Sequence, residues 1–382
     1  MASAIPQEKL AEIVREARAR SGVPAVAAGL LAGGRVELAA DGPVDVETPF
    51  RIASITKWFT ASLAALLLDL DAPSAAAGAS VGRLLSHTAD LRPNSRELLP
   101  EQCRGLWSYS NAGFVLAGRE CEAAAGISFS TAVQERLLEP LGLERTSFDE
   151  PRDAAPGHAQ EGALGHREIS DVVYPESRRA AGGLWSTVDD LLRFAAHQFG
   201  GPGPLSEAQL RSVHEPRAEA LGDRYCLGCW SRHLVGDRLV FDHEGSVGGY
   251  QSLLLLVPEE ETALAVLTNS WRGSGLIRRV VRDLGLGPAP VELAGEDPIA
   301  AGRYELDDTV AVVEDHDGRW RVAESEIDPL TGLLIERPEY GVNALGGGVY
   351  GFGGGMLMSH RVDFPRRGVA RVGWTALPAA DS

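Results

Sequence analysis

The stretch Phe50-Arg51-Ile52-Ala53-Ser54-Ile55-Thr56-Lys57-Trp58-Phe59-Thr60 opens an apolar run that extends to Leu70. In the first turn of a helix, Ser54 and Lys57 share one face, with their Cβ atoms about 5–6 Å apart. The helix N-terminus offers free N–H groups and positive potential to negative charge that develops on the serine. An amine removed from bulk water can lose its proton near neutral pH and act as a base. The stretch therefore predicts an activated serine, although a Ser-x-x-Lys pair alone has low specificity.

A second group is Trp107-Ser108-Tyr109-Ser110-Asn111, which lies just before a predicted helix. A tyrosine hydroxyl near a lysine ammonium can have a lowered pKa and share the role of base. The amide of Asn111 can bind a substrate carbonyl or hold the lysine. This group therefore supplies a possible partner for each end of the Ser-Lys pair.

Two later groups complete the predicted site. In Asp242-His243-Glu244-Gly245-Ser246, on a late strand, we expect His243 to face a cleft and the glycine to let a substrate approach the backbone. Trp185, in a Gly182-Gly183 turn, adds a bulky wall.

Ser54-x-x-Lys57, Tyr109-x-Asn111 and His243-x-Gly245 occur in an order that resembles the serine β-lactamase and penicillin-binding-protein superfamily. The branch it is most similar to holds class C β-lactamases, esterases and D-alanyl-D-alanine peptidases. The resemblance covers most of residues 20–285 and implies an α+β fold, with an antiparallel sheet flanked by helices and a helical subdomain. We expect a catalytic domain over residues 1–292 and a small all-β domain, which resembles lipocalins, over residues 298–382.

The resemblance also implies roles. Ser54 would attack a carbonyl, Lys57 and Tyr109 would move its proton, and His243 would take part in catalysis. The backbone N–H groups of Ser54 and Ser246 would form the oxyanion hole, where one donor is typically worth about 3 kcal/mol. The side chains and backbone expected to contact the substrate are Asn111, Gly245, Ser246, Trp107 and Trp185. His243 replaces the lysine usual in penicillin-recognising members, which argues against β-lactams as substrates.

Other interpretations of the same residues stay open. Ser54 could simply cap a helix, and His243 could be a structural histidine. Trp107 and Trp185 more often pack than bind ligands, although both flank the proposed cleft. A catalytically inactive binding module is the third interpretation of the whole chain.

Composition excludes several classes of function. The 382 residues contain 36 Lys and Arg against 53 Asp and Glu, a net charge of −17 that disfavours nucleic acid and anionic membranes. We see no secretory start and no apolar run long enough to span a bilayer, so we expect a cytoplasmic protein. Four cysteines fit free thiols in a reducing compartment, and Cys226-Leu227-Gly228-Cys229 has no second pair to make a zinc site. We expect neither a metal nor a cofactor, and the buried cysteines are assigned to strands.

Hydrophobic periodicity predicts the elements. Helices are expected over residues 7–20, 54–70, 81–85, 111–125, 130–138, 187–199 and 276–284. Strands are expected over residues 23–31, 36–39, 225–233, 239–242, 249–257 and 263–269, with a polar surface excursion over residues 150–171. Beyond residue 298, short strands are expected over residues 304–306, 310–313, 320–322, 333–336 and 371–374, with glycine-rich turns over residues 346–355.

The sequence therefore predicts a serine acyl-enzyme hydrolase or acyltransferase that acts on an ester or amide. The acyl donor would be a small molecule or peptide, and the acceptor would be water or an amine. With an amine acceptor, the enzyme would be a transacylase of natural-product biosynthesis, forming amides or releasing a cyclised peptide. The sequence does not indicate the acyl group, the stereochemistry or the oligomeric state.

Overall fold

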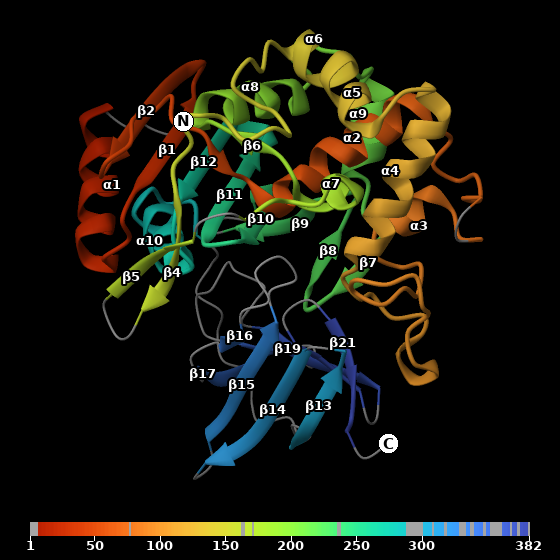
Figure 1. Ribbon diagram of the computed structural model, residues 1–382. Helices are drawn as coiled ribbons and strands as arrows, with labels where there is room; N and C mark the ends of the chain where they lie inside the picture. The colour runs from red at the N-terminus through yellow and green to blue at the C-terminus, as the bar shows by residue number, and fades with distance from the viewer. Residues whose placement is uncertain are drawn as a thin grey trace.

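The computed structural model describes residues 7–75, 78–161, 165–169, 172–234, 238–287, 301–307, 309–316, 319–327, 334–336, 340–346, 349–351, 361–366, 369–372 and 375–380. It comprises a larger body of sheet and helices and a smaller body of strands (Figure 1). The predicted boundary between the two, at residues 292–298, lies outside the described residues and stays a prediction.

An eight-stranded antiparallel sheet forms the centre of the larger body, in the order β2-β1-β12-β11-β10-β9-β8-β7. Its strands are β1 Val26–Ala32, β2 Arg35–Asp41, β7 Ala218–Ala220, β8 Asp223–Tyr225, β9 Trp230–Leu234, β10 Arg238–Val247, β11 Tyr250–Val257 and β12 Thr262–Thr268. The first and last helices, α1 Gln7–Ser21 and α10 Gly273–Asp283, pack their apolar sides on one face (Figure 1). The predicted early strands and late strands thus pair in one sheet, although a central block of helices separates them in the sequence.

Helices cover the other face and form the helical region (Figure 1). They are α2 Thr56–Leu67, α3 Val81–Leu85, α4 Asn111–Ala125, α5 Phe129–Val133, the π-turn η3 Gln134–Leu138, α6 Glu139–Leu141, α7 Arg179–Gly182, α8 Val188–Gln198 and α9 Glu207–His214. Gly126 ends α4 in the left-handed region with φ of 70°, and the Thr187 hydroxyl caps the start of α8 by accepting from the Asp190 N–H. The first ten residues of α2 are all buried, so the helix that follows Ser54 is fixed by packing on every side.

The structure corrects two predictions of this region. The strand predicted over residues 225–233 is broken, because Cys226–Cys229 forms a turn in which the Cys226 N–H donates to the Cys229 carbonyl (2.8 Å). Gly228 has φ of 75°, and a Cβ there would lie 2.6 Å from the Lys57 carbonyl oxygen, so the turn packs directly on α2. Both thiols are buried as predicted, but in this turn rather than in a strand.

The second correction concerns the excursion over residues 150–171. It contains a hairpin, β4 Gly157–Glu161 and β5 Gly165–Ile169. A further two-stranded sheet pairs β3 Phe50–Arg51 with β6 Trp185–Ser186. This pairing joins the segment before Ser54 to the turn around Trp185, although 134 residues of sequence separate Arg51 from its partner.

The smaller body is a nine-stranded antiparallel sheet. Its strands are β13 Gly302–Leu306, β14 Thr309–His316, β15 Arg319–Ile327, β16 Leu334–Glu336, β17 Tyr340–Gly346, β18 Val349–Gly351, β19 Arg361–Arg366, β20 Val369–Val372 and β21 Thr375–Pro378. Tyr304 forms a β-bridge with Ala379, which brings the chain after the last strand onto the first, as in an up-and-down barrel. Leu333, Trp374 and most of the predicted glycine-rich turns lie outside the described residues.

The two bodies share an apolar cluster. Leu99 and Cys103, from the segment between α3 and α4, are buried among residues of the barrel. Close by, the Ala376 N–H of β21 donates to the Ser108 hydroxyl oxygen (3.2 Å). The barrel therefore contacts the segment that contains Tyr109.

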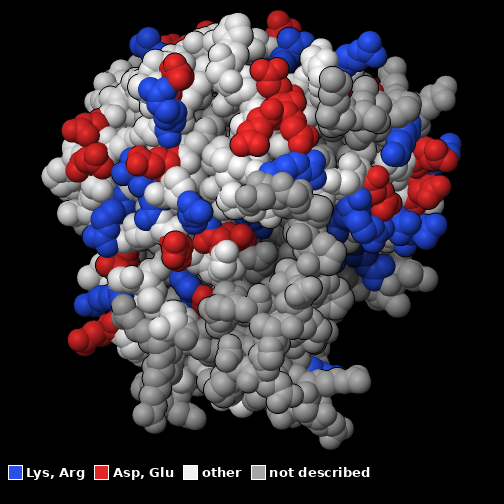
Figure 2. Space-filling view, turned by 180° about the vertical axis from the view of Figure 1, so that it is seen from behind, with Lys and Arg blue, Asp and Glu red and all other residues white. Residues whose placement is uncertain are grey.

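Figure 2 shows acidic and basic side chains together over the back of the larger body. That nucleic acid is not a partner stays a prediction. Among the described residues, no helix has both the length and the apolarity that a membrane crossing requires.

Candidate active site

Ser54 lies in a short 3-10 turn, η1 Ala53–Ile55, immediately before α2. Ala53 has φ of 48°, in a region that residues with a Cβ rarely adopt. The two residues beside Ser54 are buried, whereas Ser54 itself is half-buried. The turn thus presents one hydroxyl at the end of a buried helix, and its unusual backbone is typical of functional sites.

Lys57 is fully buried, and its amine contacts three oxygen atoms. The Nζ atom lies 3.0 Å from the Ser54 hydroxyl oxygen and 2.8 Å from Asn111 Oδ1. The third contact is a hydrogen bond to the backbone carbonyl of Ala181. Burial, with the charge of Arg178 as a second cause, holds the pKa of Lys57 well below its ordinary value. The lysine is therefore poised to be a neutral amine beside the serine.

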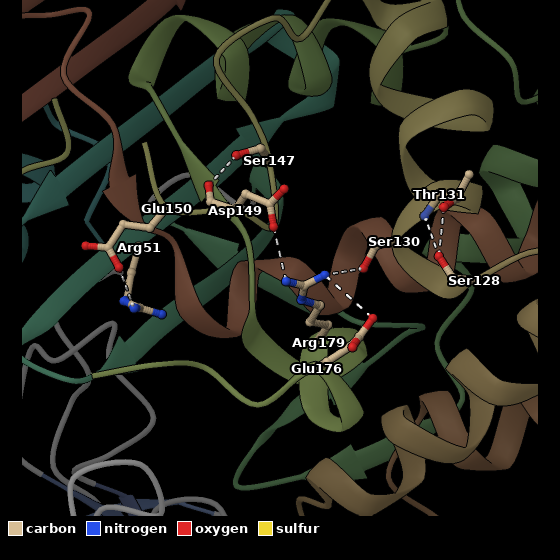
Figure 3. Close-up of polar contacts among 9 residues, drawn as sticks. All are labelled: Arg51, Ser128, Ser130, Thr131, Ser147, Asp149, Glu150, Glu176 and Arg179. Atoms are coloured by element: carbon tan, nitrogen blue, oxygen red, sulfur yellow. Dashed lines mark hydrogen bonds and ion pairs between the residues drawn. The ribbon is translucent and has the colours of Figure 1, made fainter. Parts of the chain in front are cut away.

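Ala181 belongs to α7, which a neighbouring arginine ties to two other segments. Arg179 donates to the Ser130 hydroxyl (3.0 Å) and to Asp149 Oδ1 (3.2 Å), as Figure 3 shows. These contacts hold the short helix whose carbonyl accepts from Lys57. Figure 3 also shows the ion pair of Arg51 with Glu150, 3.5 Å between Nη2 and Oε2, beside the segment that leads into Ser54.

Tyr109 lies beside both members of the pair. Its ring centroid is 4.8 Å from the Lys57 amine, and its hydroxyl forms a hydrogen bond with Ser54. Burial raises the pKa of Tyr109 above its ordinary value, while the bond with Ser54 acts in the opposite direction and is weaker. The expectation that Lys57 lowers this pKa is therefore wrong, because desolvation of the phenolate dominates. Tyr109 is a neutral phenol that can donate and accept a proton.

His87 supports Tyr109 from behind, with ring centroids 4.1 Å apart. Its Nδ1 accepts from the Ser110 N–H (3.0 Å), so its Nε2 carries the proton and donates to the Tyr225 hydroxyl (3.2 Å). Burial, the leading cause, lowers the pKa of His87 well below its ordinary value. We assign His87 a structural role.

Asn111 is the first residue of α4, where Ser110 caps the helix by accepting from the Gly113 N–H (3.2 Å). Its Oδ1 faces Lys57, and its Nδ2 donates to Asn94 Oδ1 (3.0 Å). The cap therefore fixes the backbone of Asn111, and the two side-chain bonds fix its amide.

His243 lies on β10 and is fully buried. Its Nδ1 lies 2.6 Å from the Glu244 carbonyl oxygen, which can only accept, so Nδ1 carries the proton. Burial first, and the Lys57 charge second, lower the pKa of His243 to about 3. His243 is therefore uncharged near neutral pH and provides no cation for a substrate carboxylate.

Gly245 lies two residues further along β10, against the Ser54 turn. A Cβ at Gly245 would lie 2.3 Å from both the Ile52 carbonyl oxygen and the Ser252 hydroxyl oxygen. The Ser252 hydroxyl itself donates to the Ile52 carbonyl (2.9 Å), which joins β11 to the same turn. Ser246, whose side chain is exposed, follows Gly245 on the same strand. Its role in the oxyanion hole stays a prediction.

The two tryptophans that were predicted to contact the substrate are almost fully buried. Trp107 is 3% exposed and packs on Trp230, with ring centroids 4.9 Å apart. Trp185 is 1% exposed, and the Arg51 guanidinium lies 4.4 Å from its ring centroid. Both positions suit packing, and direct contact with a substrate stays a prediction.

The structure also brings to the site residues that no sequence pattern identified. Asn94 accepts hydrogen bonds from both Asn111 and Arg178. Ala181 contributes only its backbone carbonyl, which accepts from Lys57. Asn94 lies in a loop and Arg178 in η4 Glu176–Arg178, both remote in sequence from Lys57. The one sequence feature that could have drawn attention to Arg178 is its position just before the predicted Gly182-Gly183 turn.

A separate hollow of about 720 Å³ lies beside the end of α8 and α9. It reaches Phe241 of β10, on which the His214 ring stacks with centroids 4.4 Å apart. Its lining includes none of the residues around Ser54, so we assign the chemistry to Ser54 and not to this hollow.

Comparison with known proteins identifies the family of the chain. A family model described as Beta-lactamase matches residues 10–285. Penicillin-binding protein 4 of Amycolatopsis lactamdurans is 26% identical over 323 residues, which cover 69% of this chain and 82% of that protein. The residues that the family model matches include Ser54, Tyr109 and His243.

Two solved structures extend the comparison. SurE has a TM-score of 0.74 at 24% identity, with 98% of each chain covered, and has also been solved with D-Leu. A D-amino acid amidase from Ochrobactrum anthropi has a TM-score of 0.62 at 24% identity, covering 72% of this chain and 97% of the amidase. At these identities the likeness shows a shared fold, which in SurE includes the region of the barrel.

Proposed function

Because this chain belongs to the beta-lactamase family, in the serine β-lactamase and penicillin-binding-protein superfamily, we propose that it is an enzyme that cleaves an ester or amide through an acyl intermediate on Ser54. The observation on which the proposal rests is the set of three oxygen atoms around the Lys57 amine. A neutral amine has two N–H groups and one lone pair. Asn111 Oδ1 and the Ala181 carbonyl can only accept, so they take the two N–H groups. The lone pair is then left for the Ser54 hydroxyl proton.

Acylation follows from this geometry. Ser54 Oγ attacks the substrate carbonyl carbon while its proton passes to Lys57 Nζ, and the carbonyl π electrons move to the oxygen. The backbone N–H groups of Ser54 and Ser246 receive that oxyanion. When the bond to the leaving group breaks, the phenol of Tyr109 gives the leaving atom its proton and takes one from the protonated Lys57 amine. The products are the Ser54 ester and the protonated leaving group, and Lys57 is neutral again.

Deacylation uses the same groups in the opposite order. An acceptor, water or an amine, loses a proton to the neutral Lys57 amine as it attacks the Ser54 ester. The Ser54 oxygen then leaves and takes up that proton. Water gives an acid and makes the enzyme an esterase or amidase, whereas an amine gives an amide.

We propose an amine as the second candidate acceptor, on one electrostatic observation. The charge of Arg178 and the buried surroundings favour a neutral Lys57 amine. An acceptor amine bound beside Lys57 would experience the same two influences and would also stay neutral and nucleophilic. Such an enzyme would form amides from esters, or release a cyclised peptide, in the biosynthesis of natural products.

For the substrate we propose a D-configured amino-acid residue next to the cleaved bond. The support is that two structural relatives are described as a complex with D-Leu and as an amidase of D-amino acids. The neutral His243 disfavours substrates whose binding depends on a cation at that position of β10.

The test is a partition experiment read by mass spectrometry. Wild type and Ser54→Ala receive D- and L-aminoacyl p-nitrophenyl and methyl esters, with and without a pool of amines. Acid released only by wild type supports a hydrolase, and amide formed at the expense of acid supports a transacylase. Turnover by wild type no faster than the rate without protein would contradict both and favour a binding module, and equal catalysed turnover by Ser54→Ala would exclude Ser54 as the nucleophile. Equal rates for D- and L-esters would contradict the proposed stereochemistry alone.

A further inference from the structure

A chain of hydrogen bonds leads from the catalytic pair to the outside of the site. Lys57 contacts Asn111 Oδ1, and Asn111 Nδ2 donates to Asn94 Oδ1 (3.0 Å). The same Asn94 oxygen accepts from Arg178 Nη2 at 2.6 Å. The three residues beyond Lys57 come from α4, from the loop before it and from η4 Glu176–Arg178.

The direction of this chain is set at its outer end. A guanidinium has donors and no acceptor, so Arg178 admits only the orientation of Asn94 in which the oxygen faces it. The Asn94 oxygen can only accept a hydrogen bond, so the Nδ2 group of Asn111 must face it. Asn111 Oδ1 then points towards Lys57. If the amide of Asn111 were reversed, its N–H groups would face the N–H groups of Lys57. The lysine would then lose one of the two acceptors that direct its lone pair to Ser54.

Arg178 also differs electrostatically from its neighbour Arg179. Arg179 pairs with Asp149, while in the part of the chain that the structure describes no carboxylate lies within 4.0 Å of the Arg178 guanidinium. The other groups that face Lys57 are Tyr109, a neutral phenol, and two imidazoles, His87 and His243, whose pKa values are lowered. Arg178 is therefore the positive charge that acts on the Lys57 amine.

We propose that Arg178 is a positioning residue for acylation: through Asn94 it fixes the side-chain amide of Asn111 in the orientation that receives the Lys57 amine. The inference rests on the proposed function, because it assigns Arg178 a part in making Lys57 a base. Arg178 touches neither Ser54 nor the reacting atoms, so its effect must pass through Asn111 and Lys57.

The experiment compares Arg178→Met, Asn94→Leu and Asn94→Asp, with neutral p-nitrophenyl esters as substrates. Arg178→Met and Asn94→Leu should each lower kcat about tenfold, with KM within about twofold, because the lost hydrogen bonds orient the base and not the substrate. Asn94→Asp keeps an oxygen that can accept from both neighbours, so its kcat at alkaline pH should return to within about threefold of wild type.

The pH profile is the readout that a merely structural role would not move. A nearby positive charge destabilises protonated Lys57, so removing it raises the pKa of Lys57. The acid limb of kcat/KM should shift upwards by about one pH unit in Arg178→Met. The control is Arg193→Met on α8, which removes an exposed guanidinium that pairs with Asp189 and has no contact with Asn94. Its acid limb should stay in place.

Labelling with a fluorophosphonate separates the possible failures. No labelling of Ser54 in wild type would overturn the proposed function and this inference with it. Labelling of wild type together with unchanged kcat and pH profiles in Arg178→Met and Asn94→Leu would overturn this inference alone. A loss confined to esters that bear a carboxylate, seen in KM with the acid limb unmoved, would make Arg178 a substrate anchor and would also overturn it.

Discussion

The Lys57 amine lies 3.0 Å from the Ser54 hydroxyl oxygen at the buried start of α2, and two carbonyl oxygens occupy its other directions. This relationship predicts that Lys57→Met loses the base without unfolding the site, because methionine fills a similar volume. We expect kcat for p-nitrophenyl esters to fall by about 10³-fold, within the range for a positioned general base. Stopped-flow release of p-nitrophenol measures it, and a fall of less than threefold would exclude Lys57 as the base.

The pH dependence of activity should follow Lys57 and not His243. The neutral amine is the active form, so kcat/KM should rise with pH through the lowered pKa of Lys57. Because the pKa of His243 is about 3, no ionisation near 6.5 should come from this histidine. A pH profile of His243→Gln that lost an ionisation between pH 6 and 7 would contradict this assignment.

The same histidine should make stability depend on pH. The pKa of His243 is about 3 in the folded state and about 6.5 when unfolded, so the unfolded chain takes up a proton first as the pH falls. Stability present above pH 6.5 is therefore lost between pH 6.5 and 3, by about 2 kcal/mol between pH 7 and pH 5. Urea unfolding of wild type and His243→Gln at both pH values checks this. An equal loss in the variant would show that His243 does not cause it.

The close approach of β10 to the nucleophile turn should make Gly245 intolerant of a side chain. In Gly245→Ala the new Cβ must push the strand away from the Ile52 carbonyl. We expect at least a tenfold loss of kcat and a destabilisation of about 1–3 kcal/mol. The matched control is Gly275→Ala in α10, where the nearest atom to a Cβ is 4.0 Å away. That variant should keep full activity.

The contact between the barrel and the larger body should support the Tyr109 segment. Leu99 is 1% exposed in the shared apolar cluster, and the adjacent Leu98 is 51% exposed. Leu99→Ala should cost about 2–4 kcal/mol of stability and lower kcat several-fold, because the segment that ends at Tyr109 loosens. Leu98→Ala should change stability by less than about 0.5 kcal/mol. Thermal unfolding and ester turnover compare the two variants.

The sequence predicted the parts of the site that depend on local pattern. The helix starting near Ser54, the helix that begins at Asn111 and the family resemblance all come from short stretches with defined chemistry. The sheet followed because its strands have strong apolar runs, although the predicted strand over residues 239–242 extends to Val247.

Long-range contacts could not be predicted in this way. The raised pKa of Tyr109 and the lowered pKa of His243 result from burial by distant segments. The bond of Arg178 with Asn94 joins residues 84 positions apart, and the Gly228 turn bends to fit the backbone of Lys57. Such contacts arise when the chain packs, and no spacing of residue types indicates them.

The most direct test of the central claim is the mass of the protein after rapid mixing with a p-nitrophenyl ester and acid quenching. We predict that wild type gains the mass of one acyl group, on the peptide that contains Ser54, and that Ser54→Ala gains none. The same acyl mass on Ser54→Ala, or acylation of another residue in wild type, would contradict Ser54 as the nucleophile.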